Sequence, residues 1–218
     1  MKKFFVIFVL FALPLGAYLF FASGVNNFAR LPVLTQQIYQ LEPFRSLEGG
    51  EEEVSFDNKI TILGFPGVEP IDYMNNAYHL AEKIYDPYAG FNDFQFVSVV
   101  PEGSEAEVEE LKQKISKVID LKKWKFVTGS SEEINALFDS LNTNLELNND
   151  LSSPNVFIID KDGKLRGRDK DDDGNELFGY DTGSIYVLNN KMTDDVKVIL
   201  AEYRLELKKY NKENTEDQ

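Results

Sequence analysis

The sequence predicts an α/β domain in which helices flank a central, mostly parallel or mixed sheet, preceded by one N-terminal transmembrane helix. Strand patterns alternate with helix patterns over residues 60–141, an order typical of such a sheet. An uncharged apolar run covers residues 4–22. Hydrophobic residues make up 43% of the chain and aromatic residues 13%, which indicates a folded domain with its own core.

The composition excludes several classes of function. The net charge is −14, whereas binding to nucleic acid needs a basic face that neutralises phosphates. The chain contains no cysteine, so it has no disulfide, Fe–S cluster, cysteine-based zinc site or thiol catalyst. It contains one histidine, which leaves no multi-histidine metal site.

Residues 1–22 have the pattern of a membrane anchor or of a signal peptide. The apolar run is near the length that a helix needs to cross a bilayer. A cleaved signal peptide has a shorter apolar region and a small-x-small site, and the residues after Ala22 form no clear site of that kind. Because Lys2 and Lys3 stay cytoplasmic, we expect a single-pass protein of the cell membrane whose C-terminal domain lies on the periplasmic, non-cytoplasmic side.

The rest of the chain divides into three parts. Residues 23–53 are expected to form a stalk that leads into the domain, with room for a short strand at 37–44. Residues 54–211 form the predicted globular domain. The polar tail 212–218 is expected to be disordered.

The first strand of the domain is predicted at 60–63, where a β-rich run ends in a glycine- and proline-containing loop. Apolar residues then recur at three- and four-residue spacing over 71–85, which predicts a helix. The Asp86-Pro87 pair is expected to end that helix. Residues 94–100 give the clearest strand, because most of them are β-branched or aromatic.

The second helix is predicted to start at Ser104, with Glu107 completing a capping-box pattern. A short strand follows at 124–129, and the next helix is capped by Ser130 or Ser131. The last predicted elements are a strand, a hairpin turn and a C-terminal helix, at 155–160, 161–164 and 191–209.

One acidic loop has the spacing of a cation site. Asp169, Asp171 and Asp173 alternate before Gly174, as in the opening of an EF-hand calcium loop. The twelfth position, where such a loop places a bidentate glutamate, is Tyr180. The loop is therefore either a weak Ca²⁺ site or a solvated acidic turn.

Three segments resemble the Sco/SenC family of thioredoxin-like copper chaperones, which help to assemble cytochrome oxidase. FVSVVPE is similar to the family's F-V-S-V-D-P-E, with Val100 in place of aspartate. WKFVTGSSEEI and SPNVFIIDKDGKLRG are similar to its W-x-F-L-T-G-S-x-E-E-I and S-x-x-x-x-L-I-D-x-D-G-x-x-R-G. The resemblance covers roughly residues 54–167 and implies a thioredoxin-like fold.

The resemblance also shows where this chain departs from the family. The family binds copper through C-P-x-x-C-P and a distant histidine, ligands that suit copper. FPGVEP fits that frame with both prolines in register, so that Phe65 and Glu69 stand at the two sulfur positions. Ser152 or a close neighbour stands at the histidine position. Phe65 is then a packing residue, and Glu69 a first-turn residue favoured by the helix dipole.

These observations predict a non-catalytic, membrane-anchored protein without thiol redox or copper chemistry. It is expected to bind a protein partner as an accessory or assembly factor of a membrane complex, and to reach the membrane through its N-terminal helix. No enzyme activity, no cofactor and no nucleic acid are expected. The alternative is a binding module for a small ligand or Ca²⁺ that uses Asp169, Asp171 and Asp173.

Overall fold

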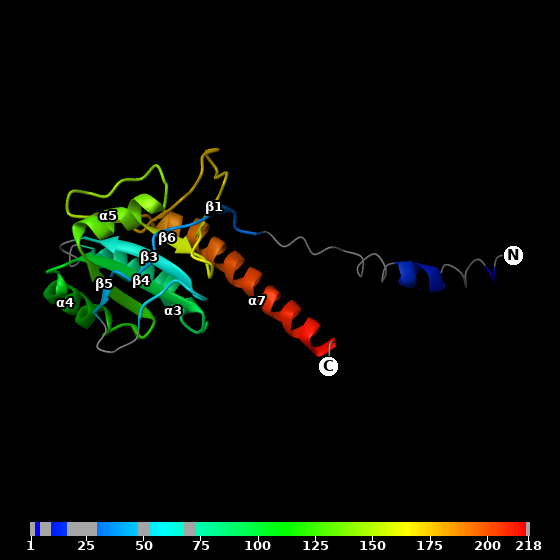
Figure 1. Cartoon of the computed structure of the whole chain (residues 1–218). Coiled ribbons are helices and arrows are strands. Elements are labelled where there is room, and N and C mark those ends of the chain that lie inside the picture. Colours follow the sequence, from blue (N-terminus) through cyan, green and yellow to red (C-terminus); the bar gives the residue numbers. More distant parts are fainter. Residues whose placement is uncertain (1–2, 5–9, 17–29, 48–52, 68–72, 217–218) are drawn as a thin grey trace.

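The computed structural model describes residues 3–4, 10–16, 30–47, 53–67 and 73–216. Strands and helices alternate as predicted through the middle of the chain (Figure 1). In chain order the elements are β1 (Val33–Thr35), β2 (Arg45–Ser46), β3 (Ile60–Pro66), α2 (Met74–Leu80), the π-helix η1 (Ala81–Tyr85), α3 (Asp86–Tyr88), β4 (Phe94–Pro101), α4 (Glu105–Ile115), β5 (Trp124–Gly129), α5 (Ser131–Ser140), β6 (Ser152–Ile159), β7 (Leu165–Arg166), β8 (Tyr180–Asp181), α6 (Ile185–Val187), the π-helix η2 (Leu188–Met192) and α7 (Thr193–Glu216).

Within the described residues the strands form one mixed sheet in the order β1-β7-β6-β3-β4-β5-β2, with β8 also paired to β6. The three central strands β3, β4 and β5 run parallel. The outer pairs, including β3 with β6 and β6 with β7, are antiparallel. This confirms the prediction of a central mixed sheet flanked by helices.

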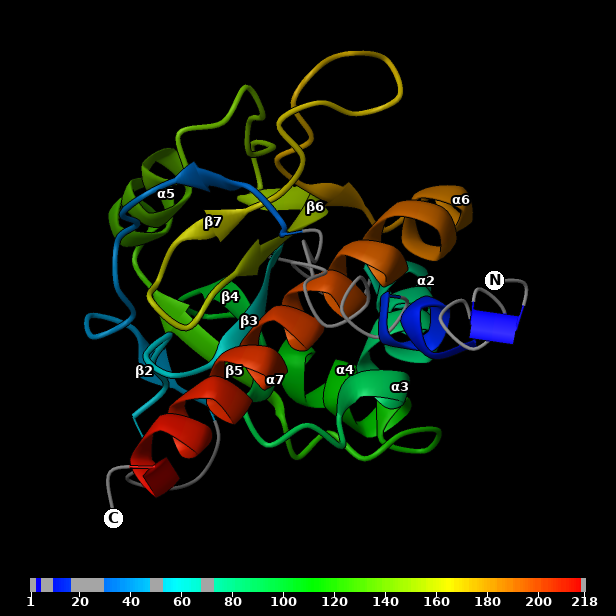
Figure 2. The same ribbon diagram turned by 90° about the vertical axis from the view of Figure 1, so that its right-hand side faces the viewer.

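Each face of the sheet is covered by its own apolar cluster. On one face the strands pack against α2, η1, α4, η2 and α7. On the other face they pack against α5. Figure 2 shows this arrangement, with α7 crossing one side of the sheet and α5 on the other side. Because alternate residues of a strand point to opposite faces, Ile62 belongs to the first cluster and Leu63 and Phe65 to the second.

The segment 30–47 belongs to the domain rather than to a stalk. Its two strands pair with the sheet, β1 with β7 and β2 with β5. The strand predicted at 37–44 is wrong, because both strands lie outside that range. Instead Ile38, Leu41 and Phe44 recur every three residues and are buried on the α5 face.

Two helix ends also differ from the prediction. The helix does not stop at Asp86-Pro87, because η1 supplies a wider turn in which the Asp86 N–H bonds to the Ala81 carbonyl and α3 follows. At the C-terminus α7 continues to Glu216, so residues 212–216 of the predicted disordered tail are helical. No glycine or proline lies between 193 and 216 to end that helix.

Most of the predicted membrane segment 1–22 lies outside the described residues. In the ranges that the structure describes, no helix combines the length and the apolar character needed to cross a membrane.

Candidate functional site

Phe65 lies near the end of β3, at the first of the two positions that correspond to a sulfur ligand. Its side chain is fully buried on the α5 face of the sheet. The ring packs edge-on against Phe138 and Phe157, with centroids 5.2 and 6.2 Å away. Phe138 and Phe157 are themselves edge-to-face at 5.8 Å, so the three rings form one aromatic cluster. The Phe65 side chain therefore stabilises the core by packing, and it has no donor atom for a metal.

Ser152, at the position of the histidine ligand, lies directly across from this strand end. In the pairing of β3 with β6, Pro66 is opposite Ser152. The Ser152 hydroxyl donates to Asp150 Oδ1 at 2.7 Å and accepts from Asn148 Nδ2 at 2.9 Å. The hydrogen bond from Ser152 holds the pKa of Asp150 below its usual value. The hydroxyl is thus part of a turn around Asp150.

Gly67 shows how closely the loop after β3 approaches β6. Its φ is +81°, a left-handed conformation, and a Cβ built there would lie 2.7 Å from Ser152 Cβ. The structure therefore brings the backbone of residues 66–67 beside Ser152. The side chains diverge, since Phe65 enters the core and Ser152 faces Asp150. Glu69 lies outside the described residues.

Tyr73 is the first tyrosine that follows residues 65–67 in the sequence. Burial, together with the charge of Asp181, raises its pKa to about 12. The phenol is therefore protonated at neutral pH and cannot serve as a general base.

The three aspartates of the acidic loop do not converge. Asp171 turns inward, where its carboxylate pairs with Arg168 Nη1 at 3.1 Å and with Lys191 Nζ. Burial opposes ionisation of Asp171, but the interactions with Lys191, the Asp172 backbone and Arg168 together outweigh it and lower the pKa. Asp173 accepts the backbone N–H of Asn175, and Asp169 is exposed. Across the described residues, no group of three acidic or histidine side chains could hold a metal ion.

The carboxylates of Asp169, Asp171 and Asp173, predicted as a cation site, therefore do not lie together in the described structure. The physical reason is that two basic side chains already neutralise the central carboxylate. Tyr180, at the position of the expected glutamate, is buried and donates its hydroxyl to Asp195 Oδ2 at 2.7 Å. Arg168 Nε donates to the same oxygen at 2.7 Å. The loop is a structural clamp between β8, η2 and α7.

Calcium titration tests this correction. We expect calorimetry of the full chain in detergent to show no binding heat up to millimolar Ca²⁺. Asp171→Ala should lower the free energy of unfolding by about 1–3 kcal/mol in calcium-free buffer, because it removes the carboxylate that pairs with Lys191 Nζ and Arg168 Nη1. Asp169→Ala is the matched control and should change it by less than about 0.5 kcal/mol. A saturable binding heat for Ca²⁺ that is lost in Asp171→Ala would show that the loop is a calcium site.

A second ionic cluster was not foreseen from the sequence. Arg166 is buried on β7 and donates to Asp160 Oδ2 at 3.0 Å, to Glu202 Oε2 at 2.7 Å and to the Leu31 carbonyl at 2.7 Å. Asp160 Oδ1 in turn accepts the backbone N–H groups of Asp162 and Lys164, which closes the hairpin turn. The signal in the sequence is an aspartate directly after an apolar strand, with an arginine six residues later.

No protein-family model matches the sequence, and no curated protein matches it. Solved structures do resemble the fold. BsSco, described as a member of the Sco family of cytochrome c oxidase assembly proteins, is 14% identical with a TM-score of 0.48, over 76% of this chain and 92% of that chain. Copper-bound ScoI of Arabidopsis thaliana is 16% identical with a TM-score of 0.46, over 74% and 98%.

A third such structure is the thioredoxin domain of a thiol-disulfide oxidoreductase from Bacteroides vulgatus. It is 14% identical with a TM-score of 0.44, over 74% of this chain and 94% of that chain. The chain is thus similar in fold to Sco-family proteins and to thioredoxin-like oxidoreductases, and it differs from a thiol enzyme in containing no cysteine.

Proposed function

We propose that this chain is a non-catalytic, membrane-anchored protein that binds a protein partner, as an accessory or assembly factor of a membrane complex. The observation that carries the proposal is the burial of Phe65 in a three-ring cluster at a sulfur position. In Sco/SenC proteins this end of the sheet would hold the copper ligands. In this chain the same end is packed by Phe65 and hydrogen-bonded through Ser152.

Two features of the chain support the absence of redox and copper chemistry. The chain has no thiol, and a thiolate is the reactive form in disulfide exchange. The Ser152 hydroxyl is a hard donor already engaged by Asp150 and Asn148. Soft sulfur and imidazole ligands are the ones that select copper.

The membrane part of the proposal rests on residues 1–22. The apolar run 4–22 is long enough to span a bilayer, and the positive charges of Lys2 and Lys3 favour a cytoplasmic N-terminus. A single pass would then place the domain on the periplasmic side. A domain without enzyme activity that is held at the membrane surface is suited to contact a membrane complex. The sequence motifs that resemble those of Sco/SenC proteins make an oxidase assembly complex the first candidate partner.

Co-purification from native membranes tests the proposal. The tagged full chain is crosslinked in membranes, solubilised in mild detergent and purified, with a tagged fragment of residues 1–30 as the matched control. We expect a stoichiometric protein partner with the full chain and not with the fragment, because the domain supplies the binding surface. Recovery of the chain without any such partner would contradict the proposal. Tight Cu(I) binding by the purified chain, in competition with a Cu(I) chelator, would contradict its non-copper part.

A further inference from the structure

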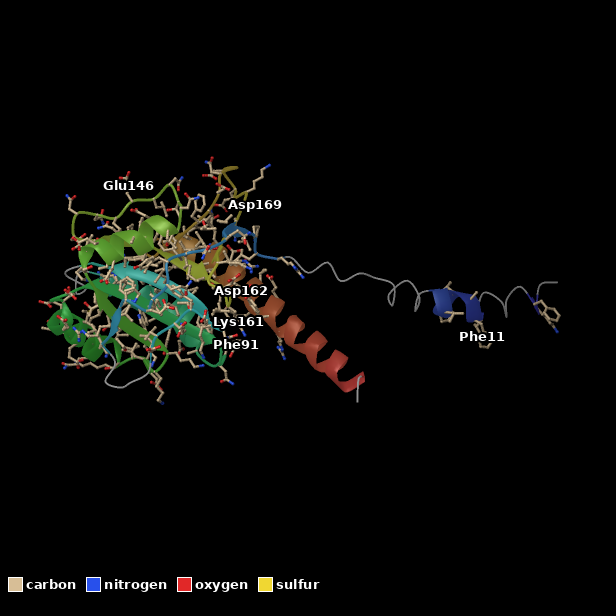
Figure 3. The ribbon with its side chains drawn as sticks, viewed as in Figure 1. Phe11, Phe91, Glu146, Lys161, Asp162 and Asp169 are labelled. Atoms are coloured by element: carbon tan, nitrogen blue, oxygen red, sulfur yellow. The ribbon has the colours of Figure 1, made fainter. Side chains whose placement is uncertain are left out.

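A small pocket lies at the end of the sheet opposite to Phe65 and Ser152. It is formed where β3 and β4 begin and where α7 passes them, and its volume is about 200 Å³. Its lining residues are Ile60, Phe91, Asn92, Asp93, Lys161, Leu200, Tyr203 and Arg204. Figure 3 shows Phe91 and Lys161 together on the side of the body next to α7, away from Asp169. We call this site the Phe91 pocket.

The loop 91–93 is held in place from several sides. The Asp93 carbonyl accepts the Ile60 N–H at 2.6 Å, and the Phe91 carbonyl accepts Lys123 Nζ at 2.5 Å. The Asp93 carboxylate pairs with Lys161. The loop therefore presents the Phe91 side chain, which is 42% exposed, on a fixed backbone. A loop whose backbone is already held in place has less entropy to lose on binding.

Several cations lie at the Phe91 pocket or against its loop 91–93, although the chain as a whole carries a net charge of −14. Lys59 and Lys123 direct their ammonium groups at the carbonyls of Asn92 and Phe91, which carry no net charge to neutralise them. Burial lowers the pKa of Lys123, and the nearby charge of Lys59 lowers it further. Arg204 is exposed at the rim, and Asp93 is the one carboxylate among the lining residues. Among the described residues, cations therefore outnumber carboxylates at the pocket and along its loop.

The geometry points to an acidic protein segment as the occupant. On the basis of the proposed partner-binding function, we propose that the partner docks here through one apolar side chain flanked by carboxylates. The volume is below the roughly 300–1,000 Å³ of small-molecule sites and suits a single anchoring side chain. Carboxylates on either side of the anchor would face Lys59, Lys123 and Arg204, which gives electrostatic complementarity.

A peptide probe tests the proposal on the full chain in detergent. The probe is a fluorescein-labelled peptide of sequence Gly-Asp-Glu-Asp-Leu-Asp-Glu-Asp-Gly, and its binding is followed by anisotropy. We expect Arg204→Glu and Phe91→Ala each to weaken binding by about tenfold or more, and added salt to weaken it further. The controls Lys170→Glu and Tyr186→Ala change an exposed cation and an exposed aromatic ring elsewhere. They should leave binding within about twofold of the unmodified chain.

Several results would overturn the Phe91 pocket as the docking site. One is the absence of saturable binding of the probe. Another is equally tight binding of a peptide in which asparagine and glutamine replace the acidic residues. The third is a loss of binding in the control variants as large as in Arg204→Glu and Phe91→Ala. The membrane co-purification separates this inference from the proposed function. A partner that Arg204→Glu and Phe91→Ala retain in full leaves the function standing and removes the site, whereas no partner with the unmodified chain removes the function itself.

Lipid is the competing occupant, because a basic patch also attracts anionic headgroups. The full chain is placed in nanodiscs of phosphatidylcholine, with and without phosphatidylglycerol, and amide hydrogen exchange is measured. We expect exchange in residues 91–93 to be the same in both and to slow when the acidic peptide is added. Protection by phosphatidylglycerol alone would assign the patch to the membrane surface and overturn the proposal.

Discussion

Phe65→Ala is expected to lower the free energy of unfolding by about 3–5 kcal/mol. The ring is fully buried and contacts Phe138 and Phe157, so its removal loses two edge-to-face contacts and leaves a cavity between the sheet and α5. Urea unfolding of the full chain in detergent measures the change. The single tryptophan, Trp124, is buried on the other face of the sheet, so its fluorescence reports on unfolding of the whole domain.

The matched control for Phe65→Ala is Tyr186→Ala. Tyr186 is also aromatic but is 60% exposed, so its loss should change stability by less than about 0.5 kcal/mol. Phe65→Leu should fall between the two, because it keeps much of the buried volume. If Phe65→Ala were as stable as the control, this strand end would be loosely packed, and the position would be open to a ligand after all.

Much of the central sheet could be predicted, because its strands carry their own local signal. The β-rich segments at 94–100 and 124–129 correspond to β4 and β5. The strands β1, β2, β7 and β8 each contain two or three residues, too few for alternation to show in a sequence. Their position depends on the partner strand, which a local pattern does not specify.

The two predicted capping motifs show the same limit. At Ser130 the structure forms a full capping box with Glu133. At Ser104 the same pattern forms no side-chain cap, because the backbone has φ −93° and ψ 12° instead of the extended conformation that aims the hydroxyl at the helix. The residue types are equivalent at the two sites, and the turn that precedes each helix decides the outcome.

The candidate site was predictable in its placement but not in its side-chain directions. The Sco/SenC resemblance predicts that positions 65 and 152 lie together, and the register of β3 with β6 places Pro66 opposite Ser152. The inward turn of Asp171 depends on Lys191, twenty residues further along the chain. No spacing rule for calcium loops takes account of a basic residue from another element.

Asp160→Ala is expected to destabilise the domain by about 3–5 kcal/mol, the cost of breaking a buried ion pair by removal of one partner. The Asp160 and Arg166 side chains are 1% and 5% exposed. The substitution leaves the Arg166 guanidinium with Glu202 and the Leu31 carbonyl, and it removes the acceptor of two N–H groups in the hairpin turn. Urea unfolding followed by Trp124 fluorescence measures the loss.

Asp162→Ala is the control for Asp160→Ala, because it removes a neighbouring carboxylate that is 64% exposed and pairs with Lys164. An exposed pair of this kind contributes about 0–1 kcal/mol. The large effect of Asp160 should therefore come from burial, since Arg166 joins β7 to the Leu31 backbone and to α7 and its side chain is only 5% exposed. If the two substitutions cost the same, Glu202 and the Leu31 carbonyl hold Arg166 by themselves, and Asp160 serves the hairpin turn alone.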